Sequence, residues 1–574
     1  MRRLDKLANT ASTKSSVSKK ARARTAAAEA KQPSPAPANA GDVPERVWRI
    51  AVIVIFLVAA VLRLYDLNLV PLHHDEGVNG NFLVRLVREG SYQYDPSNYH
   101  GPTLYYFAAF FPWVVRVLFG KEAQETYGLT TVTIRFIPAL FGVATVVLIF
   151  FLRRRLGTIA TLTAALLLAI SPGAVYLSRY FIHETQFVFF TLAIVVAGIY
   201  AYDRHDGSFL VLGSASAALL FATKETAIIS AAVLIIAFAV TRVYVRLRYG
   251  KTPLPKSKGR MQPEAGFFSR LIAHFGGPIV ISIWLVLAVI VFVSLYALFY
   301  SSFTENPKGI ADSFETFKVW TKTGTTAHFH PFFSYFEWLM NREGPLLVLG
   351  ALGAAFVVLK PRNSLALFIA LWTFGLIAAY SLIPYKTPWL LLNFVVPLAL
   401  IAGYAIQVIY EFDPGQFRMT AIVLLLAVLV SAYQTIDLNF VNYDNDNERY
   451  VYVYAHTTRS TLDLVKEIDR IAKEENGGLT GISVFSPDYW PLPWYLRNFS
   501  RVGYYNGLAQ TTEPLLIANE NQKADVDANY GEVYEQVLSN KEGGSFELRP
   551  GVKLFLYHRR KGFRPAEPPL ITRP

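Results

Sequence analysis

Long apolar runs recur along this chain, and they limit its possible folds more than any other feature. The run RIAVIVIFLVAAVLRLY at 49–65 carries charges only near its ends. A helix needs roughly 20 apolar residues to cross ~30 Å of hydrocarbon. Composition agrees, because 53% of the 574 residues are hydrophobic and only 17% are charged, whereas soluble domains average about 25% charged residues. The sequence therefore predicts a polytopic, all-α membrane domain.

We expect about eleven transmembrane helices. They are predicted near residues 47–65, 132–152, 158–176, 186–202, 208–222, 227–243, 278–300, 345–360, 364–383, 388–410 and 418–436. The segment 103–119 is also apolar, but counting it as a crossing would place Arg153, Arg154 and Arg155 outside the cell. Basic residues favour the cytoplasmic side, so this segment is predicted to be re-entrant or to lie in the interface.

The net charge of +13 is concentrated in the N-terminal tail and in the loop 242–270. Both are expected on the cytoplasmic side of the cell membrane. No basic stripe alternates with stacking aromatics, which argues against nucleic acid as a partner. The chain has no cysteine, which excludes disulfides, thiol catalysis and cysteine-bound metals.

Four regions follow from these patterns. They are a disordered basic cytoplasmic tail at 1–45, a transmembrane domain at 46–436, its external loops 66–131 and 301–344, and a C-terminal domain at 437–574. An odd number of spans places the C-terminal domain outside the cytoplasm.

The C-terminal domain is predicted to be a small α/β domain. VKEIDRIAKEE at 465–475 has helical periodicity, while GISVF at 481–485 and VKLFLYHR at 552–559 are typical of strands. SPDYWPLPWYLRN at 486–498 is dense in aromatics and proline. It is either a loop that faces a carbohydrate or partner, or core sequence with Trp490 and Trp494 buried, and we favour the core.

Two histidines and two carboxylates, HHDE at 73–76, follow the first span directly. One interpretation is structural: Asp75 caps the next helix and Glu76 complements its dipole. Capping needs only one acid, however, and it requires no histidines.

Other ionisable residues stand at or near predicted span ends, where charge is costly and typical of pathways or active sites. They are Arg135, Arg179, His183, Glu184, Lys224, Glu225 and Lys386. Any single cation could reach the interface by snorkelling. The predicted topology nevertheless places Arg135, Glu184, Lys224 and Lys386 with Asp75 at one extracytoplasmic face. Carboxylates with cations suit a reaction on an anionic lipid headgroup, in which cations hold a phosphate and a carboxylate accepts a proton.

Several familiar motifs are missing. HET at 183–185 lacks the second histidine of a zincin, and no Walker A or dinucleotide fingerprint occurs. GALGA at 350–354 lies within a predicted span and indicates close helix packing.

The order of the charged motifs resembles that of the polyprenyl-phosphate-dependent glycosyltransferases of the GT-C superfamily. The similarity is to protein O-mannosyltransferases and lipid A aminoarabinose transferases. In chain order the matching residues are Asp75-Glu76, His100-Gly101-Pro102, Arg135 with Pro138 and Gly142, Arg179 with Glu184, Thr223-Lys224, and Ser381 with Lys386 and Pro388. His100-Gly101-Pro102 replaces a double proline, and Glu184 stands where an aspartate is usual. Within this group the chain looks closest to the flippase-activity-associated proteins of archaeal-type glycosylation.

The resemblance implies an inverting glycosyltransferase that moves a sugar from a polyprenyl-phosphate donor to an acceptor hydroxyl of a glycan, lipid or protein. It implies catalytic roles for Asp75 as base and for Glu76 and Glu184. His100, Arg135, Arg179, Lys224 and Lys386 are the implied phosphate-binding residues. His74 and His183 are candidates for a divalent metal ion, although adjacent histidines usually cannot both reach one ion.

Two other functions stay open. The first is a non-catalytic membrane protein that assists export of lipid-linked oligosaccharides and binds polyprenyl phosphate without reacting. The second is an ion-coupled transporter, which is disfavoured because the charges gather at one face instead of the bilayer midplane.

Overall fold

The computed structural model describes residues 43–98, 100–249, 267–323, 329–412, 417–538 and 542–562. The predicted tail at 1–45 lies almost entirely outside the described residues, as does most of the predicted loop 242–270.

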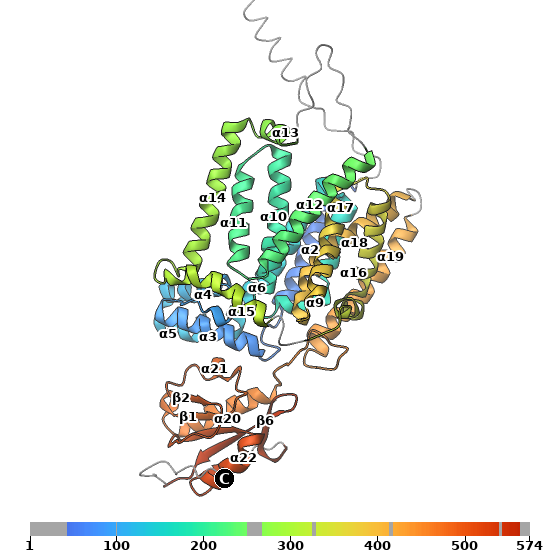
Figure 1. Ribbon diagram of the computed structural model, residues 1–574. Helices are drawn as coiled ribbons and strands as arrows, with labels where there is room; N and C mark the ends of the chain where they lie inside the picture. The colour runs from blue at the N-terminus through green and yellow to red at the C-terminus, as the bar shows by residue number, and fades with distance from the viewer. Residues whose placement is uncertain are drawn as a thin grey trace, which may run out of the picture. The chain divides into compact units, whose positions relative to one another are not determined.

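The membrane domain is a bundle of long apolar helices (Figure 1). The long helices are α2 (Glu45–Leu64), α6 (Thr131–Phe150), α10 (Glu184–Arg204), α12 (Ala227–Tyr249), α14 (Pro278–Tyr300), α16 (Ser334–Leu359), α17 (Ser364–Leu382), α18 (Leu392–Phe412) and α19 (Arg418–Ile436). Within the described ranges these nine are long and apolar enough to cross a membrane. The bent pair α8 (Thr158–Ala169) and α9 (Pro172–Ser178), with 57° between its two helices, makes a tenth.

The one predicted span that is not among these ten, 208–222, forms the short helix α11 (Ser208–Phe221). Its 14 residues extend only about 21 Å at 1.5 Å per residue. It nevertheless packs lengthwise between α10 and α14 (Figure 1). Lys224, just after α11, pairs with Glu184 at the start of α10. With its flanking residues, α11 therefore runs antiparallel to α10 and extends back to the residue at which α10 begins.

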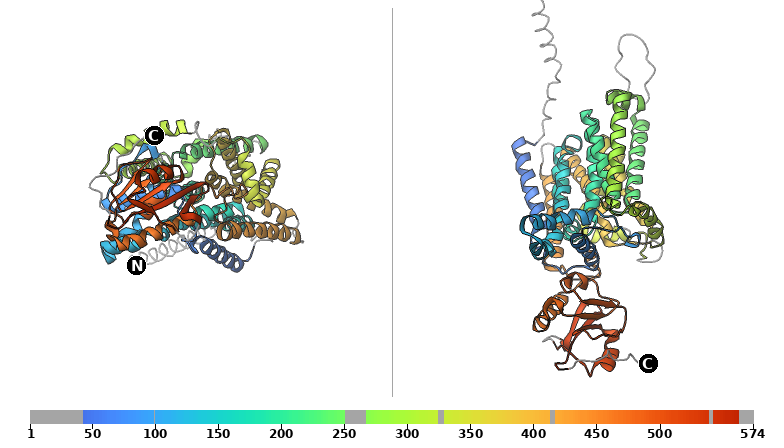
Figure 2. Two further views of the ribbon diagram at one scale, coloured as in Figure 1. Left: turned by 90° about the horizontal axis from the view of Figure 1, so that it is seen from below. Right: turned by 90° about the vertical axis from the view of Figure 1, so that its left-hand side faces the viewer.

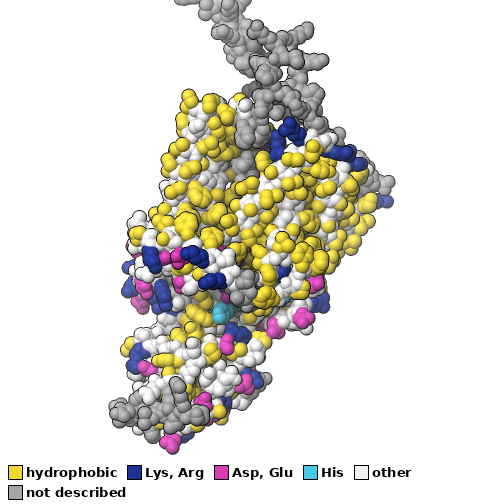
Figure 3. Space-filling model, in the orientation of Figure 1, with side chains coloured by type: hydrophobic (Ala, Val, Ile, Leu, Met, Phe, Trp, Pro, Cys, Tyr) yellow, Lys and Arg dark blue, Asp and Glu magenta, His cyan; other side chains and the backbone are white. Residues whose placement is uncertain are grey.

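A second layer of helices lies across one end of the bundle (Figures 1 and 2). It comprises α3 (His74–Glu89), α4 (Thr103–Phe119), α5 (Lys121–Ala123) and α15 (Lys308–Thr323). The segment predicted to be re-entrant or interfacial is α4, which at 17 residues is a shorter apolar helix than the spans. Figure 3 shows hydrophobic side chains covering the bundle, while charged ones gather at its two ends and on the C-terminal domain.

The remaining short helices connect these elements. They are α7 (Arg153–Leu156), α13 (Phe267–His274), η1 (Pro96–Asn98), η2 (Gln124–Gly128), η3 (Pro388–Leu391) and η4 (Asp437–Val441).

The C-terminal domain is the predicted α/β domain, built on one mixed sheet. Its strands are β1 (Ile482–Phe485), β2 (Val502–Tyr505), β3 (Leu515–Asn519), β4 (Tyr534–Gln536), β5 (Ser545–Arg549) and β6 (Val552–Arg559). Its helices are α20 (Ser460–Glu474), α21 (Leu492–Tyr495) and α22 (Glu520–Tyr530). The sheet order is β2-β1-β3-β6-β4, and β5 pairs with β6. β1 is parallel to both neighbours, and β6 is antiparallel to its partners. Both predicted strands and the predicted helix are confirmed.

The aromatic segment 486–498 forms the contact between this domain and α3. A Cβ on Gly77 would lie 2.5 Å from Cβ of Pro491, and one on Gly80 would lie 2.6 Å from the Trp494 ring. Trp494 is buried among apolar side chains of α3 and α4, while Trp490 is only half-buried. The expected burial is confirmed for Trp494, but not within the domain's own core, because the glycines on α3 open a surface that receives it.

Close packing through GALGA at 350–354 is confirmed. A Cβ on Gly350 would lie 2.3 Å from Cδ1 of Leu398, and one on Gly353 would lie 2.2 Å from the carbonyl oxygen of Ile401. Helices α16 and α18 therefore approach with backbone against backbone.

We predict that Gly353→Ala destabilises the bundle by about 1–3 kcal/mol, because the new methyl group meets a carbonyl that cannot rotate away. Thermal unfolding in detergent measures this effect. Gly198→Ala in α10 is the matched control, since no atom lies within 4 Å of its added Cβ. Equal melting temperatures for the two variants would contradict the packing.

Candidate active site

A cavity of about 380 Å³ lies where the second layer meets the bundle. Six segments far apart in the sequence line it. Their lining residues are His74, Asp75, Val78 and Asn79; Ser97, Asn98 and His100; Ile182, His183 and Glu184; Lys224, Glu225 and Thr226; Trp320; and Tyr380, Ile383, Tyr385, Thr387, Trp389 and Leu390. The predicted gathering of charged residues at one face is therefore present for Asp75, Glu184 and Lys224.

The start of α3 leaves Asp75 facing this cavity. His73 caps the helix, because its Nδ1 accepts from the backbone N–H of Asp75 at 3.1 Å. Glu76 completes the capping box by accepting from the N–H of His73 at 2.9 Å. The expectation that Asp75 caps the helix was wrong. Its carboxylate is 44% exposed instead.

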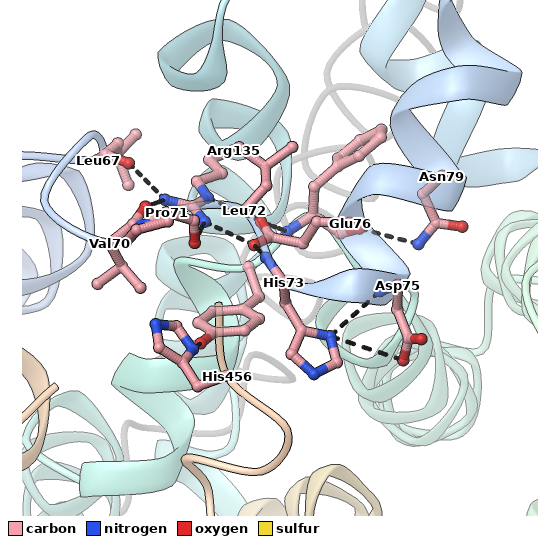
Figure 4. Close-up of polar contacts among 12 residues, drawn as sticks. Leu67, Val70, Pro71, Leu72, His73, Asp75, Glu76, Asn79, Arg135 and His456 are labelled. Atoms are coloured by element: carbon pink, nitrogen blue, oxygen red, sulfur yellow. Dashed lines mark hydrogen bonds and ion pairs between the residues drawn. The ribbon is translucent and has the colours of Figure 1, made fainter. Parts of the chain in front are cut away.

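Glu76 points away from the cavity and forms a buried ion pair with Arg135 of α6 (Figure 4). Arg135 donates to the Glu76 carboxylate through Nε at 2.7 Å and Nη2 at 2.5 Å. The same carboxylate accepts from the N–H of Phe181 at 2.7 Å. Arg135 also donates to the carbonyls of Leu67, Val70 and Pro71. Both groups are fully engaged and neither lines the cavity.

Two further predicted phosphate ligands also bind backbone. Arg179 donates to the carbonyls of Leu62, Tyr65 and Asp66 at the end of α2. Lys386 donates to the carbonyls of Ile383 at 2.7 Å and His330 at 3.1 Å. Neither residue lines the cavity, although Lys386 stands between the lining residues Tyr385 and Thr387.

Two polar pairs in the cavity lining are formed by the adjacent residues Lys224 and Glu225. Lys224 Nζ donates to Oε1 of Glu184 at 2.5 Å, and Nδ1 of His100 lies 3.1 Å from Oε2 of Glu225. Burial alone would lower the pKa of Lys224, but the carboxylates of Glu184 and Glu225 outweigh it and raise that pKa above its usual value. Lys224 is therefore cationic. Glu225 was seen in the sequence only as the neighbour of Lys224, because its partner His100 is 125 residues away.

Gly101 explains why this chain departs from a double proline. Its N–H donates to the carbonyl of Thr223 at 3.0 Å, a bond that proline cannot make. A Cβ at this position would lie 2.1 Å from the carbonyl oxygen of Ala222. The glycine thus lets the loop cross the end of α11 and places His100 beside Glu225.

Two of the lining histidines, His100 and His183, lie next to each other. The ring centre of His183 lies 4.9 Å from that of His100, and His183 Nε2 lies 3.0 Å from the carbonyl oxygen of Gly101. Burial lowers the pKa of His183 well below its usual value, with smaller contributions from His100 and Lys224. In the described part of the chain, no three His, Asp or Glu side chains are grouped to hold a metal ion. His74 and His183 belong to no such group.

We predict that Glu76→Gln costs about 3–5 kcal/mol of folding stability, because it leaves the buried Arg135 charge without its carboxylate. Thermal unfolding of purified protein in detergent measures the loss. Asp75→Asn, one residue away, should unfold near the wild-type temperature because its side chain is half-exposed. A larger loss for Asp75→Asn than for Glu76→Gln would refute this division of roles.

Comparison with known proteins agrees with this architecture. Residues 107–256 match the family model described as dolichyl-phosphate-mannose-protein mannosyltransferase. No curated protein matches the sequence.

Solved structures match over much more of the chain. The structure of ArnT from Cupriavidus metallidurans bound to undecaprenyl phosphate has a TM-score of 0.56 at 13% identity, covering 90% of this chain and 98% of ArnT. Its apo form gives 0.54 at 13% identity, covering 89% and 97%. The Archaeoglobus fulgidus oligosaccharyltransferase AglB, in complex with an inhibitory peptide and a dolichol-phosphate, gives 0.49 at 14% identity, covering 82% and 69%.

The class is thus defined at the level of fold. The protein is a multi-pass membrane protein with an ArnT-like helical domain and a C-terminal mixed α/β domain. The fold expected from the GT-C resemblance is confirmed.

Proposed function

We propose that this protein is a glycosyltransferase that moves a sugar from a polyprenyl-phosphate donor to an acceptor hydroxyl, with Asp75 as the base. The proposal rests on the different positions of the two adjacent acids at the start of α3. Glu76 is held in a buried ion pair, while the half-exposed carboxylate of Asp75 lines the cavity. The partial match to the mannosyltransferase model and the fold shared with ArnT support it.

The reaction needs one proton acceptor and one stabilised leaving group. The acceptor oxygen attacks the anomeric carbon, a new C–O bond forms, and the bond from that carbon to the phosphate oxygen breaks. Asp75 takes the hydroxyl proton, and polyprenyl phosphate leaves with the bonding electrons. Attack from the face opposite the phosphate inverts the anomeric centre.

Lys224 is the proposed phosphate ligand in the cavity wall. It uses one N–H on Glu184, and an ammonium group has three donors, so others remain for phosphate oxygens. Lys386 adds positive charge between two residues of the cavity lining, Tyr385 and Thr387. We propose that Glu184 orients Lys224, that His100 contacts the substrate, and that Arg135 and Arg179 hold the loop between α2 and α3. Trp320, Tyr380 and Trp389 provide the apolar surfaces of a small-ligand pocket.

We also propose that the cavity opens on the extracytoplasmic side of the cell membrane. Basic residues concentrate at the opposite end of the bundle, which is typical of a cytoplasmic face. They are Arg153, Arg154, Arg155, Arg204, Arg242, Arg246, Arg248, Lys360 and Arg362. Arg155 also pairs there with Asp203 of α10, and its carbonyl accepts from Asn363 before α17.

The first test compares Asp75→Asn with wild type in sugar transfer from a panel of polyprenyl-phosphate sugars. Loss of the base should lower kcat by about 10²–10⁴-fold and leave binding of undecaprenyl phosphate unchanged. Glu89→Gln, an exposed acid at the other end of α3, is the matched control and should transfer normally.

Two outcomes would contradict the proposal. Full transfer by Asp75→Asn would remove its role as base. A wild-type protein that binds undecaprenyl phosphate, but releases no polyprenyl phosphate from any sugar donor, would favour the non-catalytic export function. That result would also agree with the resemblance to flippase-activity-associated proteins.

Lys224 is tested by binding of undecaprenyl phosphate. Because Lys224→Met alone leaves Glu184 buried and unpaired, the double variant Lys224→Met/Glu184→Gln removes both charges. We expect it to fold and to bind about 10- to 100-fold more weakly, the value of one or two hydrogen bonds to a charged group. Lys466→Met on the exposed face of α20 is the control, and equal affinity of the two variants would exclude Lys224 as the ligand.

A further inference from the structure

The C-terminal domain contacts the wall of the cavity at His74. Arg549, the last residue of β5, places Nη1 3.5 Å from Nδ1 of His74. Its Nη2 donates to Oδ1 of Asp488, in the loop after β1. The ring of Trp490 lies 6.2 Å from that of His74, centre to centre. Since His74 also lines the cavity, it touches the proposed substrate space and the C-terminal domain at once.

The partners of His74 determine which of its nitrogens carries the proton. A guanidinium group can only donate hydrogen bonds, so Nδ1 of His74 must accept from Arg549. A neutral ring then carries its proton on Nε2. Burial lowers the pKa of His74, with His73 and Arg549 acting in the same direction and Asp75 and Asp488 opposing them, and the net shift is downward. The ring is therefore neutral near pH 7, with one N–H left to donate.

We propose that Arg549 is a positioning residue, supplied by the C-terminal domain, that fixes His74 so that its Nε2–H can donate to a substrate oxygen beside Asp75. This inference rests on the proposed transferase. The hydrogen bonds from Arg549 to Asp488 and to His74 connect the C-terminal domain to α3. The bond to Asp488 limits the rotation of the guanidinium group. A donor held next to a base can orient the acceptor, whose hydroxyl must meet Asp75 in one geometry.

The surrounding contacts hold the two domains in this register. The N–H of Leu72 donates to the Tyr495 hydroxyl at 2.8 Å, and Nε2 of His73 lies 2.8 Å from the carbonyl oxygen of Tyr454. Trp494 fills the space left by Gly80. The segment that carries His74 and Asp75 is thus fixed from the C-terminal side, and the C-terminal domain becomes part of the site.

The contact itself is tested without turnover, by ¹⁵N NMR of histidine-labelled full-length protein in detergent, with His74→Gln to assign the signal. Wild type should show His74 neutral and protonated on Nε2 at pH 7. Arg549→Met should release it into a mixture of both tautomers, while Arg501→Met, which removes an exposed arginine paired with Glu513, should change nothing. A wild-type ring protonated on Nδ1, or one indifferent to Arg549→Met, would overturn the inference.

The role in transfer is tested with the same variants. Arg549→Met should lower kcat by up to about 100-fold with the KM for the lipid donor unchanged, and Arg549→Lys, which keeps a donor, should recover part of it. Asp488→Asn, at a half-exposed side chain, gives a second route to the same defect should Arg549→Met fold poorly. Wild-type kcat in Arg549→Met or Asp488→Asn would exclude the positioning role. Absence of turnover in the wild type would overturn the proposed transferase function and with it this role of Arg549. The NMR result would still show whether Arg549 fixes the tautomer of His74.

Discussion

The buried ion pair between Glu76 and Arg135 is the interaction on which the site depends. It joins α3 to α6, and through its remaining bonds it fixes the loop after α2 and the backbone at Phe181. Charges buried this completely are costly unless every lone pair and donor is used, and here they are used. The result is a rigid start for α3, which decides where Asp75 lies.

Division of labour between neighbours follows from helix geometry. Successive residues on a helix point about 100° apart, so Asp75 and Glu76 cannot serve the same space. Glu76 turns inward to Arg135 and also completes the capping box with His73. Asp75 is left at the cavity with its carboxylate half-exposed. Lys224 and Glu225 lie in the turn between α11 and α12, and they too form different pairs in the cavity wall.

Much of the fold could be predicted from the sequence, because long apolar runs have few places to go. Most of the spans, the apolar helix at 103–119, the strands at 481–485 and 552–559, and the close contact at GALGA follow from periodicity and composition. Helix α11 was the difficult case, since its 14 residues are short for a span and only its pairing across Lys224 and Glu184 shows its path.

The sequence by itself determined that this is a membrane protein with titratable groups gathered at one face, because hydrophobic length and charge cost are local properties. Only the tertiary structure decided which of those groups face a cavity. In the sequence, Arg135, Arg179 and Glu76 belong to the same kind of charged motif as Asp75 and Lys224. In the structure they bind backbone carbonyls and buried side chains, and no local sequence pattern identifies these partners. Likewise, the contact of Arg549 with His74 joins residues 475 positions apart, a separation that only the folded chain can close.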